Sequence, residues 1–139
     1  MATRFWVVVT SRDHALDGEK AGIVQVNHGK NAPLKRMAAG HKVLYYASKM
    51  GIGQKELCQR FVALATLTDD DIFQHEMTST FKPYRRKATY EQVKEAEIRP
   101  LIDDLEFIKV KEKWGYIFRT GFFEINQHDF DLIISHMHK

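Results

Sequence analysis

Apolar residues come in short runs along this chain, separated by glycine, asparagine and charged residues. The first run, residues 4–10, is β-branched and aromatic, and it predicts a buried strand. Further apolar or alternating runs predict extended segments at 23–27, 41–48, 58–68, 85–90, 107–110, 114–119 and 122–125. The acidic residues 69–71 are expected to end the strand over 58–68.

Helix signals lie between these runs. The predicted helices span 11–20, 32–39, 95–105 and 127–137. Ser11 and Asn126 are favourable N-caps for the first and the last of them, and Gly22 can close the first in the left-handed conformation. The last helix is expected to turn an apolar face, built from Phe130, Ile133, Ile134 and Met137, towards the core.

Several short strands and a few short helices, without a βαβ rhythm, favour an α+β fold over a doubly wound sheet. A chain of 139 residues favours a single domain over 1–139, because two separate cores would each be too small. The sequence has no apolar run of about 18 residues, so we expect no membrane span. The first run lacks the features of a signal peptide and Cys58 has no partner for a disulfide, which predicts a cytoplasmic protein.

The charge is unevenly distributed. Net charge is only +3, yet residues 1–60 hold ten Lys and Arg against four Asp and Glu. The stretch between Glu19 and Glu56 has no acidic residue and contains Lys20, Lys30, Lys35, Arg36, Lys42, Lys49 and Lys55. Such a segment is typical of proteins that bind a phosphate-bearing partner, and a solvated basic face is the alternative.

Two segments carry candidate binding chemistry. Gln25, Asn27, His28 and Lys30 combine amides, an imidazole and a cation around a flexible glycine, which suits recognition of a base edge and a phosphate. A capped turn between a strand and a helix explains the same residues equally well. Arg85-Arg86 follows Phe81 and Tyr84, an arrangement used to bind single strands, although a solvated strand edge is as good an explanation.

Catalytic and metal-binding patterns are absent from the sequence. None of the seven histidines has the spacing of a metal site, and Cys58 is the only cysteine. There is no GxSxG elbow and no phosphate-binding GxxxxGK[ST] loop. We therefore expect no enzyme activity, no cofactor and no metal.

Five segments in order resemble the EVE family: FWVVVTSRDHALDG, GIVQVNHGKNAPLKRMAAGHKVLYYASK, FKPYRRKATY, PLIDDLEFIK and WGYIFRTGFFEI. The resemblance covers about residues 5–137 and implies a PUA-like fold, a small mixed β-barrel of five or six strands flanked by short helices. It also implies kinship with YTH domains, which enclose a methylated adenine in an aromatic cage. Gly40-His41 and Ala47-Ser48-Lys49 depart from the family's usual Gly-Asp and Ser-Pro pairs.

The resemblance, with the chemistry above, predicts a non-enzymatic module that binds a modified base in DNA or RNA, and methylation is the expected modification. The alternative is a sensor of a free nucleotide or another planar small molecule. The predicted ligand-binding residues are Trp6, Ser11, Gln25, Asn27, His28, Lys30, Tyr46, Ser48 and Trp114. The predicted contacts to the nucleic-acid backbone are Lys35, Arg36, Lys49, Arg85 and Arg86. Because Tyr45 and Tyr46 face opposite sides of a strand, Tyr46 is assigned to the pocket and Tyr45 to the core.

Overall fold

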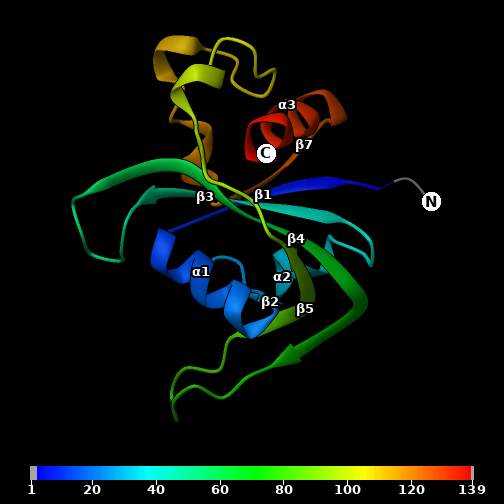
Figure 1. Ribbon diagram of the computed structural model, residues 1–139. Helices are drawn as coiled ribbons and strands as arrows, with labels where there is room; N and C mark the ends of the chain where they lie inside the picture. Colours follow the sequence, from blue (N-terminus) through cyan, green and yellow to red (C-terminus); the bar gives the residue numbers. More distant parts are fainter. Residues whose placement is uncertain (1–2, 139) are drawn as a thin grey trace.

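The computed structural model describes residues 3–138, whose strands form one open mixed sheet with helices on both faces (Figure 1). At its centre β1 (Phe5–Thr10) pairs in parallel with β3 (Lys42–Lys49). On its other side β1 pairs in antiparallel fashion with β7 (Phe122–Ile125), which forms one edge of the sheet.

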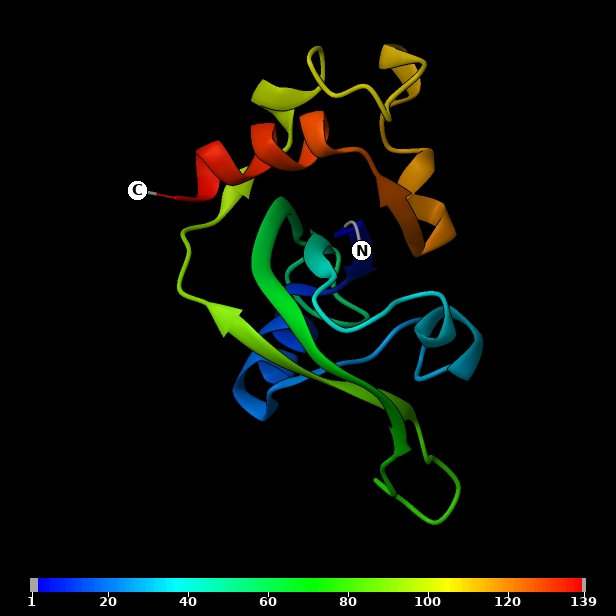
Figure 2. The ribbon, with the colours of Figure 1, turned by 90° about the vertical axis from the view of Figure 1, so that its right-hand side faces the viewer.

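The long strand β4 (Leu57–Gln74) continues the sheet beyond β3 in antiparallel pairing. Next to it lies β5 (Tyr84–Glu91), and β2 (Ile23–Val24) forms the far edge. The two-residue strand β6 (Ala96–Glu97) pairs with the opposite end of β4. In Figure 2 the β4–β5 hairpin projects from the bottom of the molecule.

This sheet confirms the mixed α+β fold and corrects the predicted barrel. Within the described residues there are seven strands, and β2 and β7 end the hydrogen-bonded path without pairing with each other. Alternating apolar residues determine which face of a strand is buried, but they do not tell whether the two outer strands meet.

Three α-helices cover the sheet. Helix α1 (Arg12–Ala21) and the short α2 (Asn31–Lys35) lie on one face, and α3 (Gln127–Met137) lies on the other (Figure 1). As predicted, the Asn126 side chain accepts a hydrogen bond from the first turn of α3, and Gly22 ends α1 with a φ of 70°. No helix in residues 3–138 combines the length and apolar character that crossing a bilayer demands.

Each face of the sheet has its own apolar core, because successive side chains on a strand point to opposite faces. Trp6 and Tyr45 belong to the core under α1 and α2, and Val7 and Tyr46 belong to the core under α3. The predicted apolar face of α3 contributes to the second core, where Ile133 is fully buried.

The segment after β5 differs from the prediction. The helix expected over 95–105 is replaced by β6 and a 3₁₀ turn (Arg99–Leu101), and the strands expected at 107–110 and 114–119 are absent. Turns and two further 3₁₀ helices occupy that region, at Lys111–Lys113 and Ile117–Thr120. Its aromatic residues pack on the α3 core from a loop, so their burial does not require a strand partner.

The expected end of β4 at residues 69–71 is also wrong. The strand runs through the three aspartates because its pairing with β5 shifts between Leu67 and Ile72, which makes a bulge. Residues 68–71 lie in this bulge, outside the regular pairing with β5. There the Asp70 carboxylate accepts a hydrogen bond from the backbone N–H of Ala39 at 2.8 Å.

Candidate ligand-binding cavity

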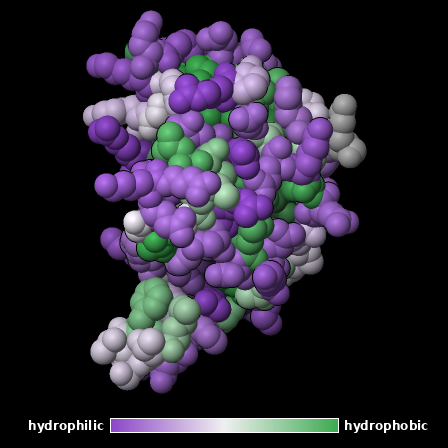
Figure 3. Space-filling view, turned by 60° about the vertical axis from the view of Figure 1, so that its left-hand side comes forward, coloured by the Kyte–Doolittle hydropathy of each residue, from purple (hydrophilic) through white to green (hydrophobic). Residues whose placement is uncertain are grey.

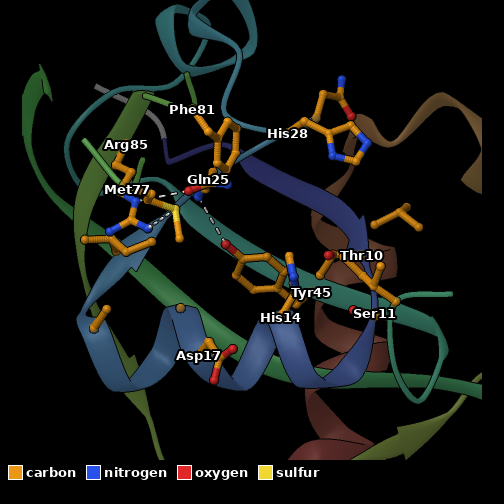
Figure 4. A pocket seen from close by; sticks show the side chains of 16 residues that line it. Thr10, Ser11, His14, Asp17, Gln25, His28, Tyr45, Met77, Phe81 and Arg85 are labelled. Carbon is orange, nitrogen blue, oxygen red and sulfur yellow. Dashed lines mark hydrogen bonds between the residues drawn. The ribbon is translucent and has the colours of Figure 1, made fainter. Parts of the chain in front are cut away.

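A cavity of about 460 Å³ opens beside the sheet, on the face that α1 covers (Figure 4). Helix α1 forms one side, the loop after β2 forms another, and the tip of the β4–β5 hairpin forms a third. Volumes of this size are usual for sites that enclose most of a small organic ligand.

Tyr45 supplies a buried wall of the cavity. Its hydroxyl accepts a hydrogen bond from the backbone N–H of Gln25 at 3.4 Å, and its ring stacks on Tyr90 at 6.4 Å between centroids. Tyr90 in turn donates to the Ile23 carbonyl at 2.7 Å. Burial raises the pKa of Tyr45 above its ordinary value, so this hydroxyl is neutral at physiological pH.

The loop after β2 turns sharply at the mouth of the cavity. Asn27, His28 and Gly29 all have positive φ, between 49° and 82°, and His28 lies at the rim. The Gly29 carbonyl accepts the backbone N–H of Tyr84 at 2.8 Å, which fastens the loop to the start of β5. Asn27 lines the cavity and its side chain lies against Gly121.

The hairpin contributes apolar side chains and a cation. Met77 and Phe81 are exposed large apolar residues at the rim, and Figure 3 shows apolar surface on the projecting end of the hairpin. Arg85 donates from Nε to the Gln25 side-chain oxygen at 3.0 Å, and its Nη2 lies 3.5 Å from the Met77 sulfur (Figure 4). The guanidinium is thus held beside the cavity.

The opposite wall is polar. Thr10, Ser11, His14 and Asp17 line it from the end of β1 and from α1 (Figure 4). The Ser11 hydroxyl donates to the Asp13 carboxylate, and this hydrogen bond lowers the pKa of Asp13. An aromatic and apolar side facing a polar side suits a planar ligand whose edge carries donors and acceptors.

The structure brings five of the predicted site residues together at this cavity: Ser11, Gln25, Asn27, His28 and Arg85. Arg85 was expected to contact the nucleic-acid backbone, and the structure places it in the cavity lining. Lys30, Ser48 and Lys49 lie outside the lining.

Of the three aromatic residues predicted to bind the ligand, two belong to the cores. Trp6 is 0% exposed, stacks on Phe122 at 5.0 Å, and donates from Nε1 to His41 at 3.1 Å. Tyr46 is 2% exposed and stacks on Phe118 at 3.9 Å. Tyr45 and not Tyr46 faces the cavity, which reverses the expectation, because residues 43, 45 and 47 share the α1 face of β3.

Trp114 lies in a different place. It lines a second cleft with Phe107. The segment 107–117 that forms this cleft lies at the end of the molecule opposite the β4–β5 hairpin (Figures 1 and 2). It therefore cannot enclose the same ligand as Tyr45.

Arg86 corrects another expectation. Its side chain is 1% exposed and donates to the carbonyls of Leu34, Met37 and Asp69 at 2.6–2.8 Å. The guanidinium ties α2 to the β4 bulge and is not free to contact a phosphate. Arg36 stays at the surface, where its guanidinium lies 5.2 Å from the Trp6 ring centroid.

The predicted absence of a metal stays a prediction. Among the described residues, Glu106, His128 and Asp129 have ligand atoms within 4.8 Å of one another. The buried Asp129 carboxylate already accepts the backbone N–H groups of Glu106 and Phe107, at 2.9 and 2.8 Å. The group is explained by the packing of that loop on the start of α3.

Sequence reasoning missed several cavity residues, above all Tyr45, Met77, His14 and Asp17. Alternation on β3 separates Tyr45 from Tyr46, but only the position of α1 tells which face carries the cavity. His14 and Asp17 are three residues apart on α1 and so share a face, a signal that becomes useful once that face is known.

An open mixed sheet with helices on both faces is a small α+β fold, and several solved structures are similar to it. A YTH domain of Zygosaccharomyces rouxii MRB1, solved in complex with N6-methyladenosine RNA, is similar in fold, with a TM-score of 0.62 and 18% identity over 96% of this chain and 85% of that one. A protein from Rhodopseudomonas palustris has a TM-score of 0.61 and 12% identity over 96% and 92% of the two chains.

Sequence comparison defines the family. The EVE domain model matches residues 4–136, and the chain belongs to the EVE domain family, which confirms the resemblance. A UPF0310 protein from Bacillus licheniformis is 42% identical over 94% of this chain and 88% of its own length. Another, from Mycobacterium avium, is 41% identical over 95% and 96% of the two chains.

Proposed function

We propose that this protein binds a nucleic acid that carries a modified base, and that the base enters the cavity beside Tyr45. The observation that carries the proposal is the lining of that cavity: aromatic and apolar side chains on one side, hydroxyl, imidazole and carboxylate groups on the other, and two side-chain amides on the loop between them. A nucleobase has matching chemistry, with two flat faces and a polar edge. The protein acts as a binding module and leaves the base chemically unchanged.

The apolar rim accounts for a preference for modified bases. A methyl group on the base would contact Phe81, Met77 or Ile52, which are 38%, 52% and 57% exposed in the unbound protein. Burial of one methyl group contributes about 0.8 kcal/mol, or roughly fourfold in affinity. Asn27 can read the polar edge, because one side-chain amide offers both donors and an acceptor, and it thereby fixes the orientation of the base that brings the methyl group to this rim.

Cations beside the cavity support a polymer as the partner. Arg85 is held next to the mouth by Gln25, and Lys30 is exposed on the adjoining loop. These positions suit the phosphates on either side of an extruded base, whereas a free nucleotide has phosphate at one position only.

The test compares methylated and plain forms of the same oligonucleotide by calorimetry. Wild type should bind the methylated form more tightly. Phe81→Ala should weaken both forms by about 1–3 kcal/mol, the usual contribution of one base stack. Asn27→Ala should mainly reduce the preference between the two forms.

Phe73→Ala is the matched control, because Phe73 lies on the same hairpin and does not line the cavity. Mass spectrometry of the recovered oligonucleotide should show no change in mass. Equal affinity for both forms would refute recognition of the modification, and binding of the nucleotide alone without salt dependence would favour the sensor of a free nucleotide. A change in mass would refute the non-enzymatic role.

A further inference from the structure

The segment from 107 to 117 carries a second cleft, of about 480 Å³, that the proposed function does not use. This segment lies at the end of the molecule opposite the β4–β5 hairpin (Figures 1 and 2). Two of its apolar residues are well exposed: Val110 at 51% and Tyr116 at 67%. An apolar surface of this kind usually marks a contact with a partner.

Cations surround the aromatic rings of this cleft. The Arg99 guanidinium lies 5.4 Å from the Trp114 ring centroid, and that of Arg119 lies 5.1 Å from the Tyr116 ring. Lys109 and Lys113 line the cleft, and its lining contains no acidic residue.

The segment itself carries one acidic residue, Glu112, which is exposed and does not line the cleft, and the acidic residue just before the segment is engaged elsewhere. Glu106 accepts a hydrogen bond from the Asn126 amide at 2.7 Å and lies 3.6 Å from the His128 ring. Three lysines outnumber Glu112 in the segment and two of them line the cleft, so the field there favours an anionic ligand.

The cleft also has a fixed shape. The Lys111 ammonium donates to the carbonyls of Ile102 and Leu105, at 3.0 and 2.9 Å, which ties the two ends of the turn together. The Trp114 ring packs edge-on against the buried Phe118 at 6.5 Å between centroids. A ligand would meet a preformed aromatic surface rather than a disordered loop.

From these contacts we propose that the cleft beside Trp114 is a second nucleic-acid contact, which stacks a base of an unmodified single strand and binds its phosphates through Lys109 and Lys113. Exposed aromatic rings bordered by cations are the arrangement that binds single strands without regard to sequence. An apolar partner surface would not need the four cations. This contact is independent of the cavity beside Tyr45.

Tryptophan fluorescence can report on this cleft separately. The chain has two tryptophans, and Trp6 is 0% exposed in the core, so quenching by a ligand reports on Trp114. The probes are unmodified oligouridylate and oligothymidylate of about eight nucleotides, within the usual size of such sites. We expect both to quench the fluorescence.

Variants then test the two parts of the contact by anisotropy of a labelled oligonucleotide. Tyr116→Ala and Trp114→Ala should each weaken binding roughly 5- to 150-fold, the effect of losing one base stack. Changing Lys109 and Lys113 together to Ala should reduce the salt slope by about 1.4 units, since each phosphate contact on a single strand contributes about 0.7. Tyr116→Ala keeps the test valid if Trp114→Ala fails to fold.

Lys87 and Lys94, changed together to Ala, are the matched control, because both are exposed and neither lines either cavity. Absence of quenching by either oligonucleotide overturns the proposal. So does tighter binding of an acidic peptide than of the oligonucleotide, or a dimer that Tyr116→Ala disrupts. Asn27→Ala should leave the quenching of Trp114 fluorescence intact. Failure of the proposed base recognition at the cavity and failure of this second contact can therefore be distinguished.

Discussion

At the scale of single residues, the close contact between Gly121 and Asn27 determines where the Asn27 side-chain amide lies in the cavity. Gly121 has a φ of 78°, and a Cβ at this position would overlap the Asn27 side-chain oxygen. The absence of a side chain at residue 121 therefore gives Asn27 its place in the lining.

Gly121→Ala should displace the Asn27 side chain and reduce the preference for a methylated base, as Asn27→Ala does. Gly53→Ala is the control, because Gly53 also has positive φ, 74°, but open space around it. Both variants carry the cost of about 1–2 kcal/mol for a left-handed alanine. Urea titration should show similar losses of stability, and calorimetry should show a changed preference only for Gly121→Ala. Equal preferences in the two variants would refute the role of this contact.

His41 gives a residue-scale prediction about pH. Its Nδ1 accepts hydrogen bonds from Trp6 Nε1 and from the Ala38 N–H, both at 3.1 Å, so the ring must be neutral to serve both. Burial, together with the nearby positive charge of Arg4, lowers the pKa of His41. A lowered folded-state pKa means that this contribution to stability is present above about pH 6.5 and is lost as the pH falls.

The measurement is the free energy of unfolding in urea at pH 7.5 and pH 5.0. Wild type should lose more stability between these values than His41→Gln, which has no group that titrates there. His128 is present in both proteins, so its contribution to the pH dependence cancels in the comparison. The hydrogen bond to Asp129 raises the pKa of His128, and this contribution to stability increases as the pH falls. Equal losses in the two proteins would contradict the prediction.

At the scale of elements, the cavity exists because the loop after β2 is fastened to the hairpin. Gly29 makes this possible, since a Cβ there would overlap Pro83 at the start of β5. The clash would fall on a rigid ring and its backbone, so neither side can move away easily.

Gly29→Ala should therefore destabilise the protein by about 1–3 kcal/mol more than Gly40→Ala, the usual cost of overpacking. Gly40 is the matched control, because its φ of 87° is similar and nothing lies within 4 Å of a Cβ there. Thermal unfolding followed by circular dichroism measures the difference. Hydrogen exchange at the Tyr84 amide should also be faster in Gly29→Ala, because this amide donates to the Gly29 carbonyl. Unchanged exchange there would argue against a role of Gly29 in holding the loop to the hairpin.

At the scale of the whole molecule, one sheet serves two cores. Strands β1 and β3 give alternate side chains to each core, so neither core can form without the same strands. This arrangement makes a single cooperative unit the expected behaviour.

Leu34→Ala, in the core under α2, and Ile133→Ala, in the core under α3, should each cost about 2–5 kcal/mol, because both side chains are fully buried. Each variant should unfold in one transition that is the same by far-UV and near-UV circular dichroism. Ser135→Ala, at an exposed position on α3, is the control and should change little. Two separated transitions would show that the cores are independent, against the prediction of a single domain.

The amino-acid sequence by itself determined the local features of this protein. Cap and stop residues located α1 and α3 to within a residue or two, and the apolar runs located β1, β3, β5 and β7. These signals succeed because they depend on neighbours along the chain. Ser11, Gln25, Asn27 and His28, which line the cavity, were singled out in the same way, since they lie close to such elements along the chain.

Only the tertiary structure decided which faces and edges meet. It assigned Tyr45 to the cavity and Tyr46 to the core, buried Arg86 among backbone carbonyls, and separated Trp114 from the cavity. It also left the sheet open and carried β4 through its aspartates on a bulge. The physical reason is that periodicity tells which side chains share a face, whereas burial depends on the distant segment that packs against that face.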